Sequence, residues 1–191
     1  MTIKVRKENK TSEGTMDTPT SDLHFRFMSF GFKIRDLFLP RKDILSEIGI
    51  KPGFHILDYG CGSGSYSIPA ADMVGSSGKV YALDIHPLAI RRLRDIASKR
   101  RLTNIEIICS ACATGLSNDS VDVVLLYDTF HCLSEPDEVL KELYRVLKRN
   151  GILSFSDHHL REKEIVPKVT NSSLFKLLKK GKRTYSLSKG Q

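Results

Sequence analysis

The sequence lacks any apolar run that approaches the roughly 20 residues of a membrane-spanning helix. Residues 1–10 are polar and charged and contain no apolar core of a signal peptide, so we expect no secretory signal. Cysteine is also scarce, with Cys61, Cys109, Cys112 and Cys132. In a chain without a secretory signal these are expected to be reduced thiols. These absences together predict a cytoplasmic protein without a membrane span.

A complete set of metal-ligating pairs is missing as well. Cys109 and Cys112 form one C-x-x-C pair, and His131-Cys132 lies further along the chain. A structural zinc site usually shows two such pairs at short spacing. We therefore predict no metal site.

Basic residues outnumber acidic ones and give the chain a formal net charge of +8. They gather in residues 91–101 and 161–189, and a surface of this kind attracts polyanions. A stacking platform for bases requires aromatic residues among the basic ones, and none are interleaved with the arginines here. The pattern favours a solvated helix face and tail, and leaves nucleic-acid binding as an alternative.

The length of 191 residues favours a single domain. Residues 1–21 are polar and without periodicity, which predicts a disordered tail. Residues 22–50 contain a phenylalanine-rich stretch and then a helix that ends at Gly49. We expect a helical segment that packs on the main body or acts as a lid over the site, two roles that overlap. Residues 51–191 form the main domain.

Within this domain, strand patterns alternate with helix patterns. The predicted strands are residues 54–58, 79–85, 104–109, 121–127 and 152–155, and the helices between them are 66–73, 87–99 and 136–148. This order predicts an α/β fold with a doubly wound, mostly parallel sheet. A helix near 163–171 and an antiparallel hairpin around Gly181 are expected to close the chain.

A glycine turn follows the first of these strands, in the segment ILDYGCGSGS at residues 56–65. Glycines allow sharp bends and a close approach of a ligand to the main chain. The spacing is G-x-G-x-G rather than the G-x-G-x-x-G of dinucleotide sites, and Asp58 precedes it. A carboxylate there would repel a pyrophosphate but suits a ligand that carries an ammonium and a sulfonium group.

Asp84 ends the second strand, about 20 residues after Gly64. A carboxylate at this place hydrogen-bonds the hydroxyls of a ribose, and Ile85 could cover one face of an adenine. The acid by itself does not distinguish a nicotinamide cofactor from S-adenosylmethionine. The glycine spacing, the single domain and the terminal hairpin favour S-adenosylmethionine.

Four motifs together resemble the class I S-adenosylmethionine-dependent methyltransferases, and in particular the small "type 11" group, which includes menaquinone/ubiquinone-biosynthesis and arsenite methyltransferases. These are LDYGCGSG, ALDIHP, DSVDVVLLYDTFHCL and LKELYRVLKRNG, and the resemblance covers about residues 53–187. It implies a Rossmann-like sheet of about seven strands whose last strand is antiparallel. It also implies that the cofactor lies at the carboxyl ends of the first strands.

The resemblance assigns roles to individual residues. Asp84 is expected to hold the ribose, with Ile85 and the loop Ala111-Cys112 at the adenine. Tyr127 and Asp128 are expected beside the sulfonium, and the methionine part falls to Asp58, Gly60, Cys61 and Gly62.

One position departs from the family pattern. Members commonly have an acid after the third strand that accepts from the adenine amino group, and Ala111 stands there in this chain. The main-chain N–H of Cys112 could still donate to the ring. The departure makes a non-catalytic cofactor-binding protein a more credible alternative.

Five further polar residues follow the fourth and fifth strands, where open α/β sheets bind ligands: Asp128, His131, Asp157, His158 and His159. Imidazole exchanges protons near neutral pH, so His131 is the predicted base, and Asp128 is expected to orient the acceptor or contact the methionine part. The sequence thus predicts in-line methyl transfer to a small-molecule acceptor, with S-adenosylhomocysteine as product and no metal. An RNA or protein methyltransferase remains the alternative.

Overall fold

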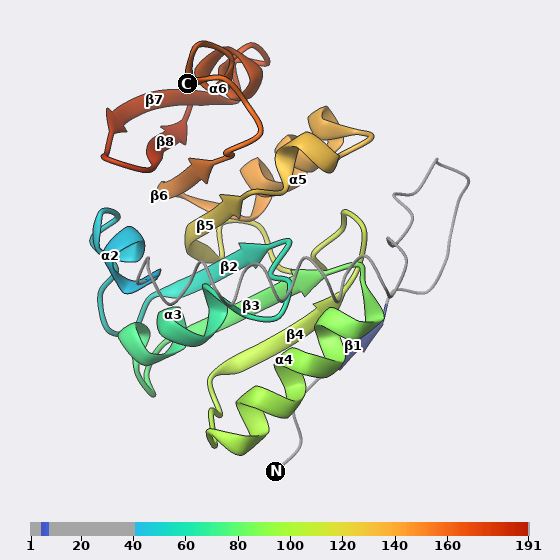
Figure 1. Cartoon of the computed structure of the whole chain (residues 1–191). Coiled ribbons are helices and arrows are strands. Elements are labelled where there is room, and N and C mark those ends of the chain that lie inside the picture. Colours follow the sequence, from blue (N-terminus) through green and yellow to red (C-terminus); the bar gives the residue numbers. More distant parts are fainter. Residues whose placement is uncertain (1–4, 8–40, 191) are drawn as a thin grey trace.

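The computed structural model describes residues 5–7 and 41–190 (Figure 1). The expected disordered tail therefore lies outside the described residues except for strand β1 (Val5–Lys7), which pairs in parallel with β4 (Ile105–Cys109). For these three residues the expectation of disorder is wrong. Most of the expected segment 22–50 also lies outside the described residues, and its last part forms helix α2 (Arg41–Ser46).

The described strands form one eight-stranded sheet in the order β1-β4-β3-β2-β5-β6-β8-β7 (Figure 1). The parallel part contains β2 (His55–Tyr59), β3 (Lys79–Asp84), β5 (Val121–Tyr127) and β6 (Leu147–Ser156), together with β4 and β1. β8 (Tyr185–Lys189) is antiparallel to both β6 and β7 (Phe175–Lys180). Seven strands follow the predicted mostly parallel arrangement with its terminal antiparallel hairpin, and β1 is the additional one.

Helices cover both faces of the sheet, which confirms the doubly wound fold. On one face α2, α3 (Ser67–Val74) and α4 (Pro87–Lys99) bury their apolar sides. On the other face α5 (Pro136–Val146) and α6 (Glu162–Thr170) do the same. Because side chains alternate along a strand, Val123 and Leu125 of β5 enter the first core and Val124 and Leu126 the second.

The order of strands determines where ligands can bind. β2 pairs with β3 on one side and with β5 on the other, so the chain reverses its direction of winding at β2. In such sheets the crevice lies beyond the carboxyl ends of the strands at this reversal. The loops that follow β2, β3, β5 and β6 are therefore the candidates for a site.

Among the described residues, no helix is long and apolar enough to cross a membrane.

Candidate functional site

The turn after β2 is built from glycines in the left-handed region. Gly60 and Gly62 have φ values of 77° and 54°, which L side chains rarely adopt. The N–H groups of Gly60 and Cys61 both donate to the carbonyl of Leu83, at 2.8 and 2.9 Å. A Cβ atom on Gly62 would meet nothing within 4 Å, so the turn has open space at this residue.

Asp58 lies buried at the end of β2, directly below the turn. One of its oxygens accepts a hydrogen bond from Ser67 Oγ, at the start of α3, at 2.5 Å. Burial raises the pKa of Asp58 to about 7, and the nearby charge of Asp84 adds to the increase, whereas the Ser67 hydrogen bond opposes it. Burial also raises the pKa of the Cys61 thiol well above its usual value, which favours the neutral thiol over the nucleophilic thiolate.

Asp84 closes the same turn from β3. Its carboxylate accepts the Gly62 N–H at 2.8 Å and the His86 N–H at 2.7 Å, so it ties the glycine turn to the beginning of α4. Burial raises its pKa, and these N–H groups partly offset that effect. Two hydrogen bonds leave further acceptor positions on the two oxygens. The helix cap itself is His86, whose Nδ1 accepts from Leu88 N–H at 3.2 Å.

The loop after β4 is ordered by its own contacts. Tyr59 Oη donates to the carbonyl of Ala111 at 2.6 Å, which joins this loop to the end of β2. The Cys112 N–H donates to Ser110 Oγ at 3.2 Å. In this arrangement the Cys112 N–H is engaged within its own loop. Ile85 lies between Asp84 and His86, half-buried at the start of the next loop.

Tyr127, expected beside the sulfonium, has a buried side chain. Its hydroxyl shares a hydrogen bond of 2.6 Å with Ser154 Oγ of β6, and its ring packs edge-on against Tyr66 with centroids 4.6 Å apart. Burial raises the pKa of its hydroxyl far above the ordinary value. This side chain therefore packs in the core, against Ser154 and Tyr66.

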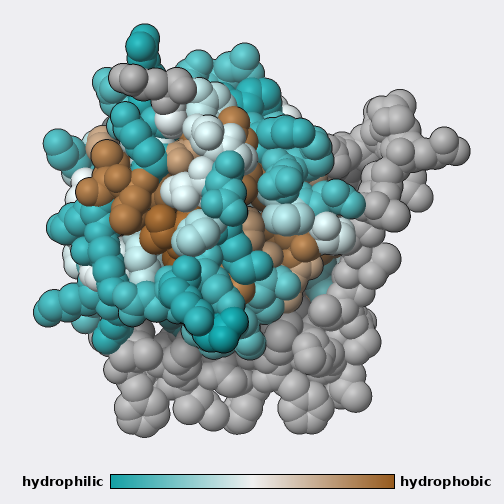
Figure 2. Space-filling view, turned by 90° about the horizontal axis from the view of Figure 1, so that it is seen from above, coloured by the Kyte–Doolittle hydropathy of each residue, from teal (hydrophilic) through white to brown (hydrophobic). Residues whose placement is uncertain are grey.

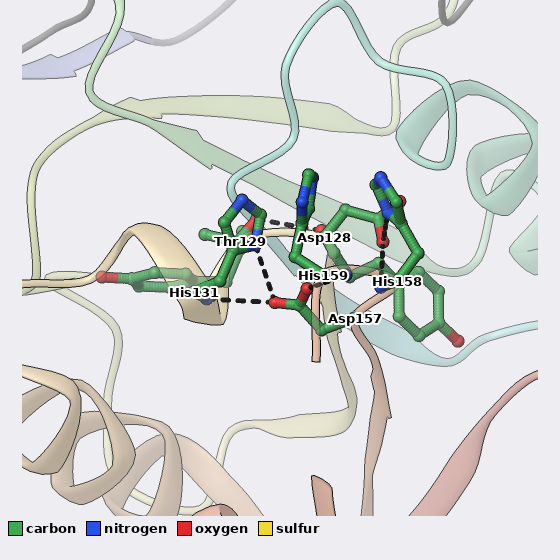
Figure 3. A network of polar contacts seen from close by, with 8 residues as sticks. Asp128, Thr129, His131, Asp157, His158 and His159 are labelled. Carbon is green, nitrogen blue, oxygen red and sulfur yellow. Dashed lines mark hydrogen bonds and ion pairs between the residues drawn. The ribbon is translucent and has the colours of Figure 1, made fainter. Parts of the chain in front are cut away.

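The loops after β5 and β6 are joined by two reciprocal aspartate–histidine pairs (Figure 3). His131 Nδ1 lies 2.9 Å from Asp157 Oδ2, and His158 Nδ1 lies 2.6 Å from Asp128 Oδ1. In each pair one loop gives the carboxylate and the other gives the imidazole. Asp128 has a φ of 50°, a left-handed conformation that aspartate tolerates better than most residues.

Asp157 is the most firmly held member of this group. It is 2% exposed, and besides the His131 ring it accepts the N–H groups of His131 at 3.0 Å and His159 at 3.1 Å. The ring of His159 lies between those of His131 and His158, with centroids 4.0 Å from each (Figure 3). The three imidazoles thus form one packed row above two carboxylates.

The glycine turn and the β5 loop also touch each other. A Cβ atom on Gly60 would collide with the side chain of Thr129, whose Oγ1 donates to the Tyr127 carbonyl at 2.9 Å. Thr129 stands between Asp128 and His131 in the chain, so the predicted cofactor residues and the predicted acceptor residues form one continuous region.

Sequence reasoning placed the acids and histidines at the correct strand ends but missed their supports. These supports are Ser67, Thr129 and Tyr59. A signal existed for Ser67, because it is a polar residue in the first turn of the helix after the glycine turn. No local signal existed for Thr129, since its contact with Gly60 joins positions far apart in the chain.

The fold and the geometry of this region define the class: the molecule has the architecture of the class I S-adenosylmethionine-dependent methyltransferases. A family model described as "Methyltransferase domain" matches residues 50–190, and the chain belongs to that family.

Similar proteins agree with this assignment. Demethylmenaquinone methyltransferase of Geobacillus stearothermophilus is 31% identical over 132 residues, which covers 68% of this chain and 56% of that protein. The corresponding enzyme of Listeria monocytogenes serotype 4a (strain HCC23) is 32% identical over 120 residues, or 61% of this chain and 50% of that protein. The chain thus spans about half the length of these curated relatives.

Solved structures show the same architecture. A SAM-dependent methyltransferase from Aquifex aeolicus superposes with a TM-score of 0.68 at 29% identity, over 78% of this chain and 88% of that one. The [4+2]-cyclase SpnF shares the fold alone, with a TM-score of 0.61 at 20% identity over 72% of this chain and 57% of that chain. The second likeness shows that the fold by itself does not define the reaction.

Proposed function

We propose that this protein transfers a methyl group from S-adenosylmethionine to a small-molecule acceptor of the quinone type, and that His131 takes up the proton the acceptor loses. The observation that carries the proposal is the pair of buried Asp157 with His131, which lies in the loops that adjoin the glycine turn. The names of the relatives support a quinone such as demethylmenaquinone as the first acceptor to test.

The residues present fit the cofactor. Gly62 leaves open space beside the turn, and Asp84 has acceptor positions left for ribose hydroxyls. Asp58, Gly60 and Cys61 would hold the methionine part, with Asp58 balancing its ammonium group. Ile85, Ala111 and Cys112 would border the adenine through apolar contact. We assign Tyr127 no side-chain contact with the cofactor, and only its main chain leads into the site.

S-adenosylmethionine, when bound, supplies a methyl group on a positively charged sulfur. In the proposed transfer the acceptor atom would form the new bond to this carbon in line with the bond that breaks, and the electron pair of the broken bond would stay on sulfur, which becomes neutral. The protein has to align the partners and exclude water, because alignment is the larger part of such catalysis. No metal is needed for this balance of atoms and charge.

Asp157 determines which nitrogen of His131 is the base. Because an ionised carboxylate can only accept hydrogen bonds, we assign the proton of this pair to the Nδ1 atom of His131. Nε2 is then left without a proton and can accept one from the acceptor. Asp128 has the same relation to His158, which is more exposed, and we assign that pair to holding the acceptor.

Turnover of His131→Ala tests the base. We expect roughly a hundredfold loss or more with reduced demethylmenaquinone, while S-adenosylhomocysteine binding, measured by calorimetry, stays within a few-fold of wild type. Asp157→Asn should show the same separation, because an amide permits the wrong tautomer. His55→Gln, at the amino end of β2, is the matched control.

The assay also separates the alternatives. If His131→Ala keeps the turnover of wild type and the same dependence of turnover on pH, His131 is not the base. His158 and His159 would then be the residues to test. Turnover only with RNA or protein in a panel of quinols, thiols, phenols, amines and macromolecules would contradict the acceptor class. Binding of S-adenosylhomocysteine without any turnover would favour a non-catalytic cofactor-binding protein.

A further inference from the structure

Two adjacent leucines of strand β7 are exposed to solvent. Leu177 is 42% exposed and Leu178 is 56% exposed, and across residues 41–190 they are the only large apolar side chains in this condition. All other large apolar residues in that range lie in or against the two cores, or are at least half-buried. Two exposed leucines are not a large apolar patch, so the case for a contact depends on what surrounds them.

Both leucines lie on the outer strand of the sheet. β7 is the last strand of the sheet, and its register with β8 shifts between Leu177 and Lys179. Leu177 pairs with Leu187 and Lys179 with Ser186, so Leu178 is the extra residue of a β-bulge. Every residue of β7 after Phe175 is exposed, and the bulge leaves Leu178 without a partner in β8 within this exposed stretch.

Basic side chains surround the pair. The exposed residues of the hairpin on either side are Lys176, Lys179, Lys180, Lys182 and Arg183. The acids nearby are fewer: Glu162 of α6 pairs with Lys180, and Glu47 accepts from Thr184 Oγ1. Seen from this end of the molecule, apolar and hydrophilic residues lie next to each other on the surface (Figure 2).

Two hollows lie along the hairpin, and Leu177 lines one of them. One, of about 420 Å³, lies between α6 and β7 and is lined by Leu177, Val166 and Tyr185 together with Lys163 and Lys180. The other, of about 760 Å³, lies between α2 and the hairpin turn, and its wall contains Lys179, Lys182 and Arg183 together with the acids Asp43 and Glu47. Apolar contact and positive charge are therefore available at the same place.

We propose that this hairpin, residues 175–183, docks on an anionic lipid surface, with Leu177 and Leu178 inserted among the lipids and the basic side chains at the phosphates. Peripheral membrane binding combines these same two contributions. A second copy of this chain fits poorly, because lysines on an edge strand oppose pairing of like edges. Leucine side chains offer a nucleic acid neither charge nor an aromatic stacking surface, and the nearby Tyr185 is too buried to stack on a base.

Co-sedimentation of the full chain with vesicles tests the proposal. We expect binding to phosphatidylcholine vesicles that contain phosphatidylglycerol, little binding to phosphatidylcholine alone, and weaker binding at high salt. The double variant Leu177→Ser/Leu178→Ser should lower the partition coefficient about tenfold. Lys179→Gln/Lys182→Gln should lower it about thirtyfold, since each basic residue contributes separately.

The matched control is Arg91→Gln/Arg94→Gln, which removes the same charge from the exposed side of α4 and should reduce binding much less. Circular dichroism confirms that each variant is folded. An equal loss in the α4 variant, or unchanged binding of the leucine variant, would overturn the proposal. So would binding of an RNA oligonucleotide that exceeds vesicle binding and is indifferent to the leucines, because this would identify a nucleic-acid surface instead.

Discussion

Replacing Asp58 by asparagine tests the buried carboxylate at the end of β2. The substitution keeps the shape of the side chain and an oxygen that can accept from Ser67, but removes the titratable group. In the native protein the pKa of Asp58 is raised from 3.8 to about 7, with burial as the largest cause. The native state therefore holds a proton that the unfolded chain releases at a much lower pH.

The sign of the effect follows from this difference. Below about pH 3.8 Asp58 is protonated in both the native and the unfolded state, so it does not lower the free energy of unfolding. As the pH rises toward about 7, only the unfolded state releases the proton, so the stability of the wild-type protein falls. The difference in pKa is worth about 4 kcal/mol, because one pKa unit corresponds to about 1.4 kcal/mol. Asparagine does not incur this cost.

Urea unfolding followed by circular dichroism between about pH 4 and about pH 8 measures the effect. Asp58→Asn should match wild type at the acid end and exceed it by about 4 kcal/mol at the alkaline end. Asp72→Asn, which removes a surface carboxylate beside Arg100, controls for the general change in charge. Stability curves of Asp58→Asn and wild type that run parallel across this range would refute the reasoning.

The same variant should bind the cofactor product poorly. If Asp58 balances the ammonium group of S-adenosylhomocysteine, it must ionise on binding, so calorimetry in buffers of different ionisation enthalpy should detect proton release below about pH 7. Asp58→Asn should lose both the proton release and the affinity. A stabilised protein with impaired binding would show that this buried acid is kept for function at a cost in stability.

The remaining predictions concern the turn and one helix. Asp84→Ala should weaken S-adenosylhomocysteine binding by about 1.5–3 kcal/mol in calorimetry, because it removes charge-assisted hydrogen bonds; equal binding would contradict the assignment. Gly60→Ala should destabilise the protein by more than about 3 kcal/mol in urea unfolding, because its Cβ meets Thr129, whereas Gly62→Ala should cost only the backbone strain of about 1–2 kcal/mol. Although burial opposes it, hydrogen bonds from Arg145 and Thr114 lower the pKa of Glu142, so Glu142→Gln should destabilise near pH 7 and the difference should vanish as the pH falls well below 4.5.

Most of the sheet could be predicted from the sequence, because its strands carry strong local patterns. Strand 121–127 and helix 87–99 have the predicted boundaries. The predicted start of β6 is wrong by five residues, because the strand begins at Leu147 and not at residue 152. Leu147 pairs with Val121 across an irregularity in the ladder, and such pairing depends on a distant strand rather than on local pattern.

Strand β1 shows the same limit more strongly. Val5–Lys7 lies in a polar stretch without periodicity, and its pairing partner in the sheet is Ile107–Cys109, about a hundred residues away. No property of residues 1–21 alone indicates this partner. An outer edge of β4 that would otherwise be open provides the hydrogen bonds.

The candidate site divides in a similar way. Position at the end of a strand is a local property, and it is the basis on which Asp58, Asp84, Asp128 and His131 are proposed as site residues. The pairing of Asp128 with His158 depends on the left-handed backbone at Asp128 and on the course of a second loop. The orientation of Tyr127 depends on Ser154 in the next strand. Neither relation is visible in a single segment.

The close packing of Gly60 against Thr129 has a consequence for how the two ligands influence each other. Because no atom fits between these residues, a shift of the glycine turn must be passed on to the loop that carries Asp128 and His131. Occupancy of one half of the crevice should therefore alter affinity in the other half. By thermodynamic reciprocity the acceptor must change the affinity for the methyl donor by the same factor, so the two should bind with heterotropic cooperativity.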